Sequence, residues 1–152
     1  MMFLLGMLAF NVWAAPKQLA ANEVSASNLK SVLGERYGTS IDDDGEVTVK
    51  KGEYFQVHLR IDSKNKVLSF YQGWTAKPSA DKTKCLEKVN RWNLERGISS
   101  VVYDAENKAF ILCYYLVFTG GIDTTNLLDT IGILLSNEED FLKDFYEAGL
   151  LE

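Results

Sequence analysis

Apolar and polar positions alternate with a period of two through the middle of the chain, a pattern typical of half-buried β-strands. The clearest example is residues 53–62, EYFQVHLRID. Residues 46–50 alternate as well, directly after the turn dipeptide Asp44-Gly45, and residues 66–74 return after a polar turn. These segments predict three antiparallel strands that bury one face.

Two further strands are predicted later in the chain, at residues 98–104 and 108–118. A short polar turn of Ala105, Glu106 and Asn107 joins them. The second strand, KAFILCYYLVF, is apolar on both of its faces, which favours a position inside the sheet rather than at its edge.

Helical spacing of apolar residues predicts two helices before these strands. The first lies in residues 27–38, with Ser27 as a candidate N-cap and Gly38 as the stop. The second covers about residues 80–94 and is closed by Gly97.

A third helix is predicted after the glycine pair at residues 120–121, with Asp123 or Thr124 as its cap. Glu138 falls on the apolar stripe of this helix if the helix is unbroken. A capping signal at Ser136 favours a break, so we expect either one long helix or two in line. The apolar stripe consists of Leu127, Leu128, Ile131, Leu134, Leu135, Phe141, Leu142 and Phe145.

The element order is therefore α-βββ-α-ββ-α, which predicts an α+β fold. We expect an antiparallel sheet of about five strands with the helices packed on one face, in a single domain over residues 27–152. The composition agrees, since 47% hydrophobic and 24% charged residues are ordinary for a globular protein. The net charge of −5 and the lack of a long basic cluster argue against binding to nucleic acid.

The first residues have the character of a targeting segment. Residues 1–14 are apolar and end in small side chains, as secretory signals do, and they are short for a membrane span. We expect a signal peptide at 1–14, a polar linker at 15–26 and export, with the bacterial periplasm as the destination. The alternatives are a retained membrane anchor or a buried N-terminal helix.

Cys85 and Cys113 are the two cysteines of the chain. In an exported protein they could form a disulfide that ties a helix to the sheet. Two separate thiols that pack as small hydrophobes explain the same count, and the sequence leaves the choice open.

Residues 89–97, VNRWNLERG, place amides on a helix that should bury apolar side chains. On a helical wheel Asn93 falls on the buried face and Asn90 toward its edge. Burial requires partners for the Asn93 amide, and we expect them in the backbone of the turn into Ile98 or in the first helix. The alternative is that Trp92 and Asn93 line a ligand pocket.

An asparagine-tryptophan-asparagine helix end, a hairpin and a glycine before the last helix occur here in that order. These features are Asn90, Trp92, Asn93, the hairpin at residues 106–107, and Gly121. Over about residues 27–147 the chain resembles the YbjN family of bacterial sensory transduction regulators. The resemblance implies a fold like that of type III secretion chaperones, with helices on one side of a sheet, in proteins that often pair into dimers.

The residues do not form a recognisable catalytic or metal-binding pattern. His58 is the single histidine, and no G-x-S-x-G signature is present. The run IDDDGE fails as a calcium loop because Lys51 takes the position that needs an acidic ligand. We therefore expect no metal or other cofactor and a protein that is not an enzyme.

The strand face opposite the helices carries mixed aromatic and polar side chains, which suits a protein partner or a second copy of the chain. These residues are Tyr54, Gln56, His58, Arg60 and Tyr71. The leading hypothesis is a non-enzymatic, exported protein-binding or regulatory domain that recognises a partner, or itself as a homodimer, through its sheet. An ordinary solvated face is the alternative for the surface. A small-ligand sensor or an enzyme with a pocket near Trp92 and Asn93 is the alternative for the function.

Overall fold

The computed structural model describes residues 17–152. In this range six strands form one antiparallel sheet, in the order β2-β3-β4-β5-β7-β6. Their bounds are β2 (Gly38–Ile41), β3 (Val47–Lys51), β4 (Phe55–Asp62), β5 (Val67–Thr75), β6 (Ser100–Asp104) and β7 (Ala109–Val117). A separate two-stranded ribbon pairs β1 (Gln18–Leu19) with β8 (Ile122–Asp123).

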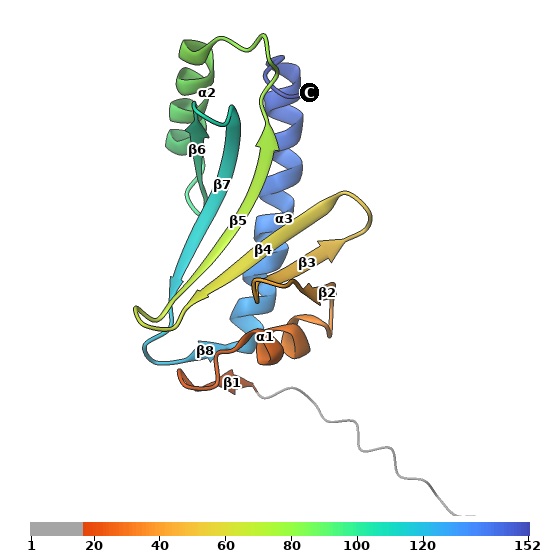
Figure 1. Cartoon of the computed structure of the whole chain (residues 1–152), viewed down its shortest axis with the longest axis vertical. Coiled ribbons are helices and arrows are strands. Elements are labelled where there is room, and N and C mark those ends of the chain that lie inside the picture. Colours follow the sequence, from red (N-terminus) through yellow and green to blue (C-terminus); the bar gives the residue numbers. More distant parts are fainter. Residues whose placement is uncertain (1–16) are drawn as a thin grey trace, which may run out of the picture.

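Three helices, α1 (Ala26–Leu33), α2 (Lys82–Glu95) and α3 (Thr124–Glu147), pack on one face of the large sheet (Figure 1). The predicted α+β architecture is confirmed, and β7 lies inside the sheet as expected. The prediction missed three short strands: β1 before α1, β2 between α1 and β3, and β8 between β7 and α3. These strands have two to four residues each, too few to show an alternating pattern.

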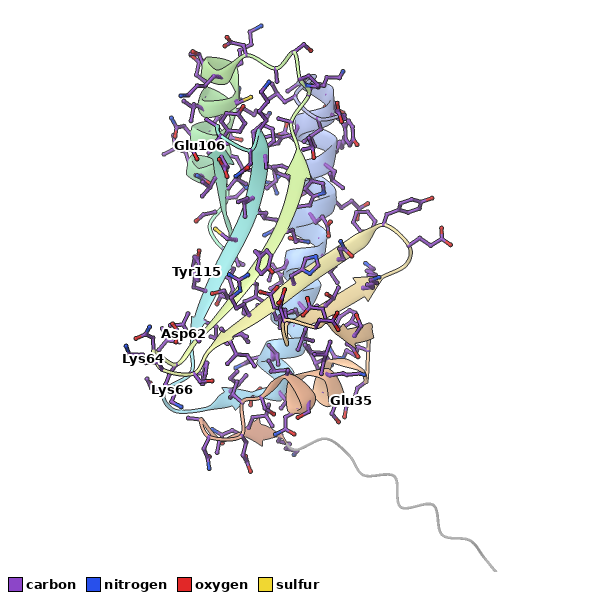
Figure 2. All side chains as sticks on the ribbon, viewed as in Figure 1. Glu35, Asp62, Lys64, Lys66, Glu106 and Tyr115 are labelled. Carbon is purple, nitrogen blue, oxygen red and sulfur yellow. The ribbon has the colours of Figure 1, made fainter. Side chains whose placement is uncertain are left out.

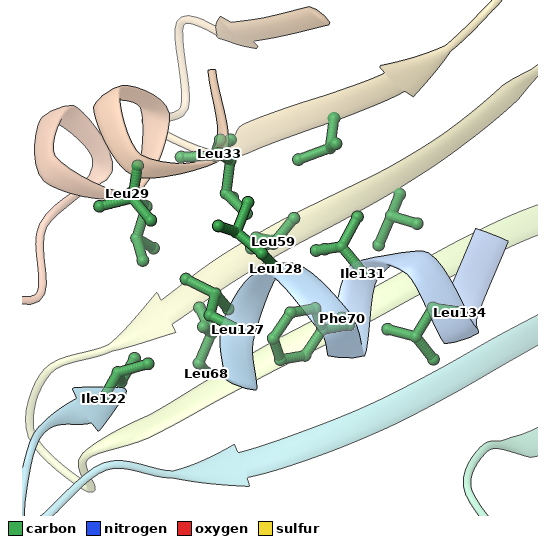
Figure 3. Close-up of a cluster of buried hydrophobic side chains, with 14 of the residues drawn as sticks. Leu29, Leu33, Leu59, Leu68, Phe70, Ile122, Leu127, Leu128, Ile131 and Leu134 are labelled. Carbon is green, nitrogen blue, oxygen red and sulfur yellow. The ribbon is translucent and has the colours of Figure 1, made fainter. Parts of the chain in front are cut away.

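The apolar stripe of α3 forms one half of the core. Asp123 is its N-cap and accepts a hydrogen bond from the Asn126 N–H, at 2.8 Å. The helix then continues unbroken to Glu147, so of the two expected arrangements the single long helix is found and the capping signal at Ser136 does not end it. Figure 3 shows leucines of α1 and α3 against side chains of β4 and β5. The labelled residues of this cluster are Leu29, Leu33, Leu59, Leu68, Phe70, Ile122, Leu127, Leu128, Ile131 and Leu134.

A second core cluster lies where α2 covers β6 and β7. Trp92, 2% exposed, meets Phe141 and Phe145 of α3 edge to face, with ring centroids 5.7 and 6.0 Å apart. Cys85 and Val89 lie on the same buried side of α2. This aromatic cluster joins the two longer helices to the half of the sheet that ends at β6.

The N-terminal boundary of the domain differs from the prediction. Leu19 and Val24 are both buried in the core, so the expected linker at 15–26 is part of the fold from Gln18 on. Ser25, rather than Ser27, caps α1, and the helix ends at Leu33, before the predicted stop. The expected signal peptide at 1–14 lies outside the described residues. Within residues 17–152 no helix has both the length and the apolar character to cross a bilayer.

Gly121 is required where β1 contacts the segment between β7 and α3. Its φ of +93° is a conformation that side-chain-bearing residues rarely adopt. An added Cβ there would collide with the carbonyl oxygen of Leu19. A glycine at this position therefore allows β1 to pair with β8 just before α3 begins.

Two hairpin turns at opposite ends of the sheet share one construction (Figure 2). In each, an aspartate accepts the backbone N–H of an asparagine three residues later, and the asparagine amide donates back to it. The pairs are Asp62 with Asn65, and Asp104 with Asn107. The residue that follows, Lys66 or Lys108, has a positive φ, which closes the four-residue loop.

Asn93 is exposed rather than buried, which corrects the prediction from the helical wheel. Its amide nevertheless has two backbone partners: it donates to the Val101 carbonyl at 2.9 Å and accepts from the Val101 N–H at 2.8 Å. These partners lie in β6, beyond the turn where we expected them. Because β6 is the outermost strand, the amide takes the place of a neighbouring strand at that point. Trp92 and Asn93 are thus both used within the fold, which gives no support to a ligand pocket between them.

The two cysteines are free thiols on opposite faces of the sheet. Cys85 lies on the buried side of α2, on the helical side of the sheet. Cys113 is half-buried in β7, in register with Tyr71 and Ser100, on the side without helices. The disulfide considered above is therefore not formed.

Glu138 is a carboxyl group in the core of the protein, 1% exposed. It accepts a hydrogen bond from the Gln72 side-chain amide at 2.5 Å and one from the Gln56 backbone N–H. Burial raises the pKa of Glu138 to about 8, and these hydrogen bonds oppose the shift only in part.

We expect Asn93→Ala to lower the free energy of unfolding by about 1–2 kcal/mol relative to Asn90→Ala, because only Asn93 holds the outer edge of β6. Asn90 is an exposed amide of the same helix, so both substitutions gain the same helix propensity. Urea denaturation of both variants measures the difference. Equal stability of the two would show that the Asn93 bridge contributes nothing.

The Glu138 pKa predicts a pH-dependent stability. A folded-state pKa of about 8, above the ordinary value of 4.5, means that the folded protein holds a proton that the unfolded chain has lost between these values. The free energy of unfolding should therefore fall as pH rises from about 5 to 8, by at most about 1.4 kcal/mol per pH unit. Glu138→Gln should remove most of this slope, whereas Glu139→Gln, on the exposed side of α3, should leave it. Urea denaturation at several pH values measures the free energy of unfolding as a function of pH. The same pH dependence in the parent protein and both variants would contradict the assignment to Glu138.

Candidate functional site: the open face of the sheet

Among residues 17–152, no helix lies on one face of the large sheet, which is referred to here as the open face. Figure 1 views the molecule from this side, with α3 running behind β4 and β5. Strand register aligns one row of side chains across the open face, because residues opposite each other in neighbouring strands share a face. The row consists of Ser40, Thr48, His58, Tyr71, Cys113 and Ser100.

A polar network occupies the centre of the open face. Glu46 bridges two neighbours: one carboxylate oxygen accepts from the Arg60 guanidinium and the other from the Tyr71 hydroxyl. The Arg60 guanidinium also lies over the Tyr71 ring, 5.5 Å from its centroid. His58 stacks on the other side of the network, with its ring centroid 5.4 Å from that of Tyr71. Thr48 Oγ1 is 3.1 Å from His58 Nδ1 and fixes that ring in turn.

Two members of the network, Tyr71 and Arg60, have raised pKa values. Burial, and then the hydrogen bond to Glu46, raise the pKa of Tyr71 to about 12, so its hydroxyl stays protonated as the donor. The hydrogen bond and charge of Glu46 raise the pKa of Arg60. The Arg60 side chain is 67% exposed and that of Glu46 only 12%. The open face therefore presents a cation whose counterion lies beneath it.

An apolar strip lies beside this network on β6 and β7. Val102, Tyr115 and Val117 are 50, 62 and 64% exposed. Figure 2 labels Tyr115 on β7, between the two hairpin turns. A hollow of about 390 Å³ lies between strip and network, and its lining includes Arg60 and Ile111. The remaining lining residues are Ser69, Phe70, Tyr71, Val102, Cys113 and Tyr115.

A second, smaller hollow of about 250 Å³ opens where β4 and β5 separate. The two strands pair only from His58 to Asp62 and from Val67 to Tyr71, and diverge beyond these residues. The hollow is lined by Tyr54, Gln56, His58, Gln72, Gly73, Trp74 and Glu138. Residues of both faces of the sheet meet here, because no strand fills the gap.

The structure brings three of the five predicted surface residues together: His58, Arg60 and Tyr71 belong to the central network. Gln56 is exposed and borders the smaller hollow. Tyr54 lies in the turn before β4 rather than in the strand, and its side chain is 81% exposed.

Sequence reasoning missed the apolar strip and the acid that organises the network. The signal for the strip was present: a strand that is apolar on both faces, in a sheet covered on one side, must expose apolar groups on the other. Glu46 gave no such signal, because it precedes β3 and meets Arg60 and Tyr71 only through the pairing of strands. Among residues 17–152, no cluster of three metal-binding side chains occurs.

Comparison with known proteins places this geometry in a family. Residues 25–147 match the model of the YbjN family, described as "Putative bacterial sensory transduction regulator". None of the curated proteins matches the sequence of this chain.

Several solved structures share the fold. A crystal structure of YbjN from E. coli superposes with a TM-score of 0.71 at 12% identity, covering 84% of this chain and 95% of that one. A chain of the HopA1-SchA chaperone-effector complex gives a TM-score of 0.52 at 14% identity, with 71% and 84% covered. The structure of the Yersinia pestis type III secretion chaperone SycH with a fragment of YscM2 gives 0.46 at 18% identity, with 72% and 95% covered.

The family model spans the domain from just before α1 to the end of α3, and the predicted resemblance, including a fold similar to that of secretion chaperones, is confirmed. This chain belongs to the YbjN family.

Proposed function

We propose that this protein is a non-enzymatic binding module that receives an extended segment of a protein partner across the open face of its sheet. The observation that carries the proposal is the exposed apolar strip of Val102, Tyr115 and Val117 beside a hollow, on a face that none of the described helices covers. Contiguous exposed apolar surface of this kind is typical of interaction sites.

The central network supplies pre-oriented anchors for such a partner. Glu46 holds both Arg60 and Tyr71, so neither side chain has to be ordered on binding. Arginine and tyrosine are also enriched among residues that dominate binding energy. Because Arg60 is more exposed than its counterion, we infer that the partner segment carries an acidic side chain next to its apolar ones.

The edge of the sheet is less suited to this task than its face. At Val101 the outer edge of β6 is already occupied by the Asn93 amide, so a partner strand cannot extend the sheet there without displacing it. The shared fold supports protein binding in general terms, since a chain of the HopA1-SchA chaperone-effector complex has this architecture.

The proposal also includes a regulatory role and export from the cytoplasm. The family description names a sensory transduction regulator, and the known fold neighbours are regulators and chaperones, which is compatible with a protein that is not an enzyme. The apolar sequence of residues 1–14 supports export to the bacterial periplasm, with cleavage before the folded domain. Sequencing the N-terminus of the exported protein would test this part separately.

A photo-crosslinker placed at Tyr115 tests the docking surface directly. We expect p-benzoylphenylalanine at position 115 to form an adduct with another protein in the native cell, while the same group at Tyr146 should not. Tyr146 is a matched control, because it is 52% exposed but lies on α3, on the helical side. Mass spectrometry of the adduct separates a foreign partner from a second copy of the chain.

The substitution Val102→Glu provides the second arm of this test. It adds a charge at the end of the strip that lines the hollow, which should weaken the adduct at position 115 at least about tenfold, because burying an unpaired charge costs more than 1.4 kcal/mol. Equal adducts at positions 115 and 146, or an adduct insensitive to Val102→Glu, would reject the open face as the docking surface. An adduct with a second copy alone would make the face a homodimer interface instead.

A further inference from the structure

The structure assigns an ammonium-binding site to the hollow between β4 and β5, with Glu138 at its base and primary alkylammonium groups, such as that of a lysine side chain, as its ligands. The site is distinct from the apolar strip, and its chemistry does not depend on protein docking. It deepens the proposed function only if the ammonium arrives on a docked segment.

The shape of the hollow follows from the way the sheet divides. β4 continues with β3 through Phe55–Val57, while β5 continues with β7 through Gln72–Thr75, so the two strands no longer bond to each other there. The Gln56 N–H, which would otherwise face β5, is instead bound by Glu138 from the helical side. A carboxyl group of α3 thus reaches into a gap that opens between the strands.

The lining offers acceptors and aromatic rings but no competing cation. Glu138 and the side-chain oxygens of Gln56 and Gln72 can accept hydrogen bonds, and two aromatic residues, Trp74 and Tyr54, are part of the lining. An ammonium group donates three hydrogen bonds and is attracted to ring faces, so it matches this set. Among the described residues, no lysine or arginine lines the hollow. Glu138 and His58 are its only side chains of the kinds that commonly bind metals, and the described part of the chain holds no cluster of three such side chains.

The energetics of Glu138 favour a cationic ligand. An isolated carboxylate in the core is costly, so without a cation the group takes up a proton near neutral pH. A bound ammonium would compensate the negative charge and release that proton. The titratable side chains that face Glu138 across the hollow are His58 and Tyr54 on the β4 side, and β5 contributes Gln72, Gly73 and Trp74, which do not titrate.

Gly73 keeps the entrance of the hollow open. Its φ lies in an ordinary region, and an added Cβ would come no closer to another residue than 4.0 Å, to the Phe110 carbonyl. Gly73→Val therefore places its Cβ without a close contact, and its methyl groups narrow the hollow from the open face. This substitution and Glu138→Gln block the site in two unrelated ways.

Calorimetric titration of the folded chain with n-butylammonium tests the site. We expect saturable binding in the millimolar range, loss of at least about tenfold in affinity in Glu138→Gln and in Gly73→Val, and no change in Glu139→Gln. Butan-1-ol, the neutral analogue, should not bind. Titration in buffers of different ionisation enthalpy should show that binding releases nearly one proton at pH 7. The affinity for butylammonium should rise with pH, by up to about tenfold per pH unit, until about pH 8.

Two results would overturn the site: the absence of saturable butylammonium binding by the parent protein, or binding that Glu138→Gln leaves unchanged. A second arm compares N-acetyl-lysine methylamide and an extended lysine-containing peptide with butylammonium. Tighter binding of the peptide, reduced by Val102→Glu, assigns the ammonium to a docked segment. Equal binding of all three probes keeps the site and assigns it to a free amine, whatever the outcome of the crosslinking experiment.

Discussion

The packing of three helices on a single face of the sheet is the constraint on which the rest of the structure depends. Leucines and phenylalanines of α3 contact β4 and β5 with one half of the helix and the α2–β6–β7 region with the other. One long helix thereby holds together two halves of a sheet whose middle strands diverge. Among residues 17–152, the same arrangement leaves the second face of the large sheet without a helical cover. The two halves of that face differ in the side chains they expose.

On the β3–β4 side, the open face is stabilised by polar contacts. Glu46 between Arg60 and Tyr71 forms a compact network that tolerates water around it, because each charge has a partner. On the β6–β7 side, the strands keep apolar residues such as Tyr115 and Val117 in the open. An exposed strip lowers solubility without adding to the core, so its presence is better explained by a contact made with another molecule than by folding.

Much of the fold could be predicted from the sequence, because it depends on patterns that are local. The alternation through Val57 and Leu59 gave the buried face of β4, and the stripe that contains Ile131 gave α3. The missed features depend on contacts between two elements rather than on a pattern within one element. Asn93 follows helical periodicity toward the core, yet its amide turns to the edge of β6, since a free strand edge offers better partners than an apolar interior. β2 has four residues and is defined by its neighbour alone.

Glu138 is another residue whose role depends on contacts between elements. The sequence showed that Glu138 lies on an apolar stripe, but it did not show what stabilises a carboxyl group there. The carboxyl group accepts a hydrogen bond from a backbone N–H of β4 that has no strand partner, because β4 and β5 diverge at that point. A glutamine would satisfy that N–H and Gln72 at a lower electrostatic cost. An ionisable residue at such a position is favoured when a cation shares the site part of the time. The gap in the sheet, the acid behind it and the glycine at its entrance therefore form one arrangement, in which a weak point of the β-layer becomes a selective opening onto the open face.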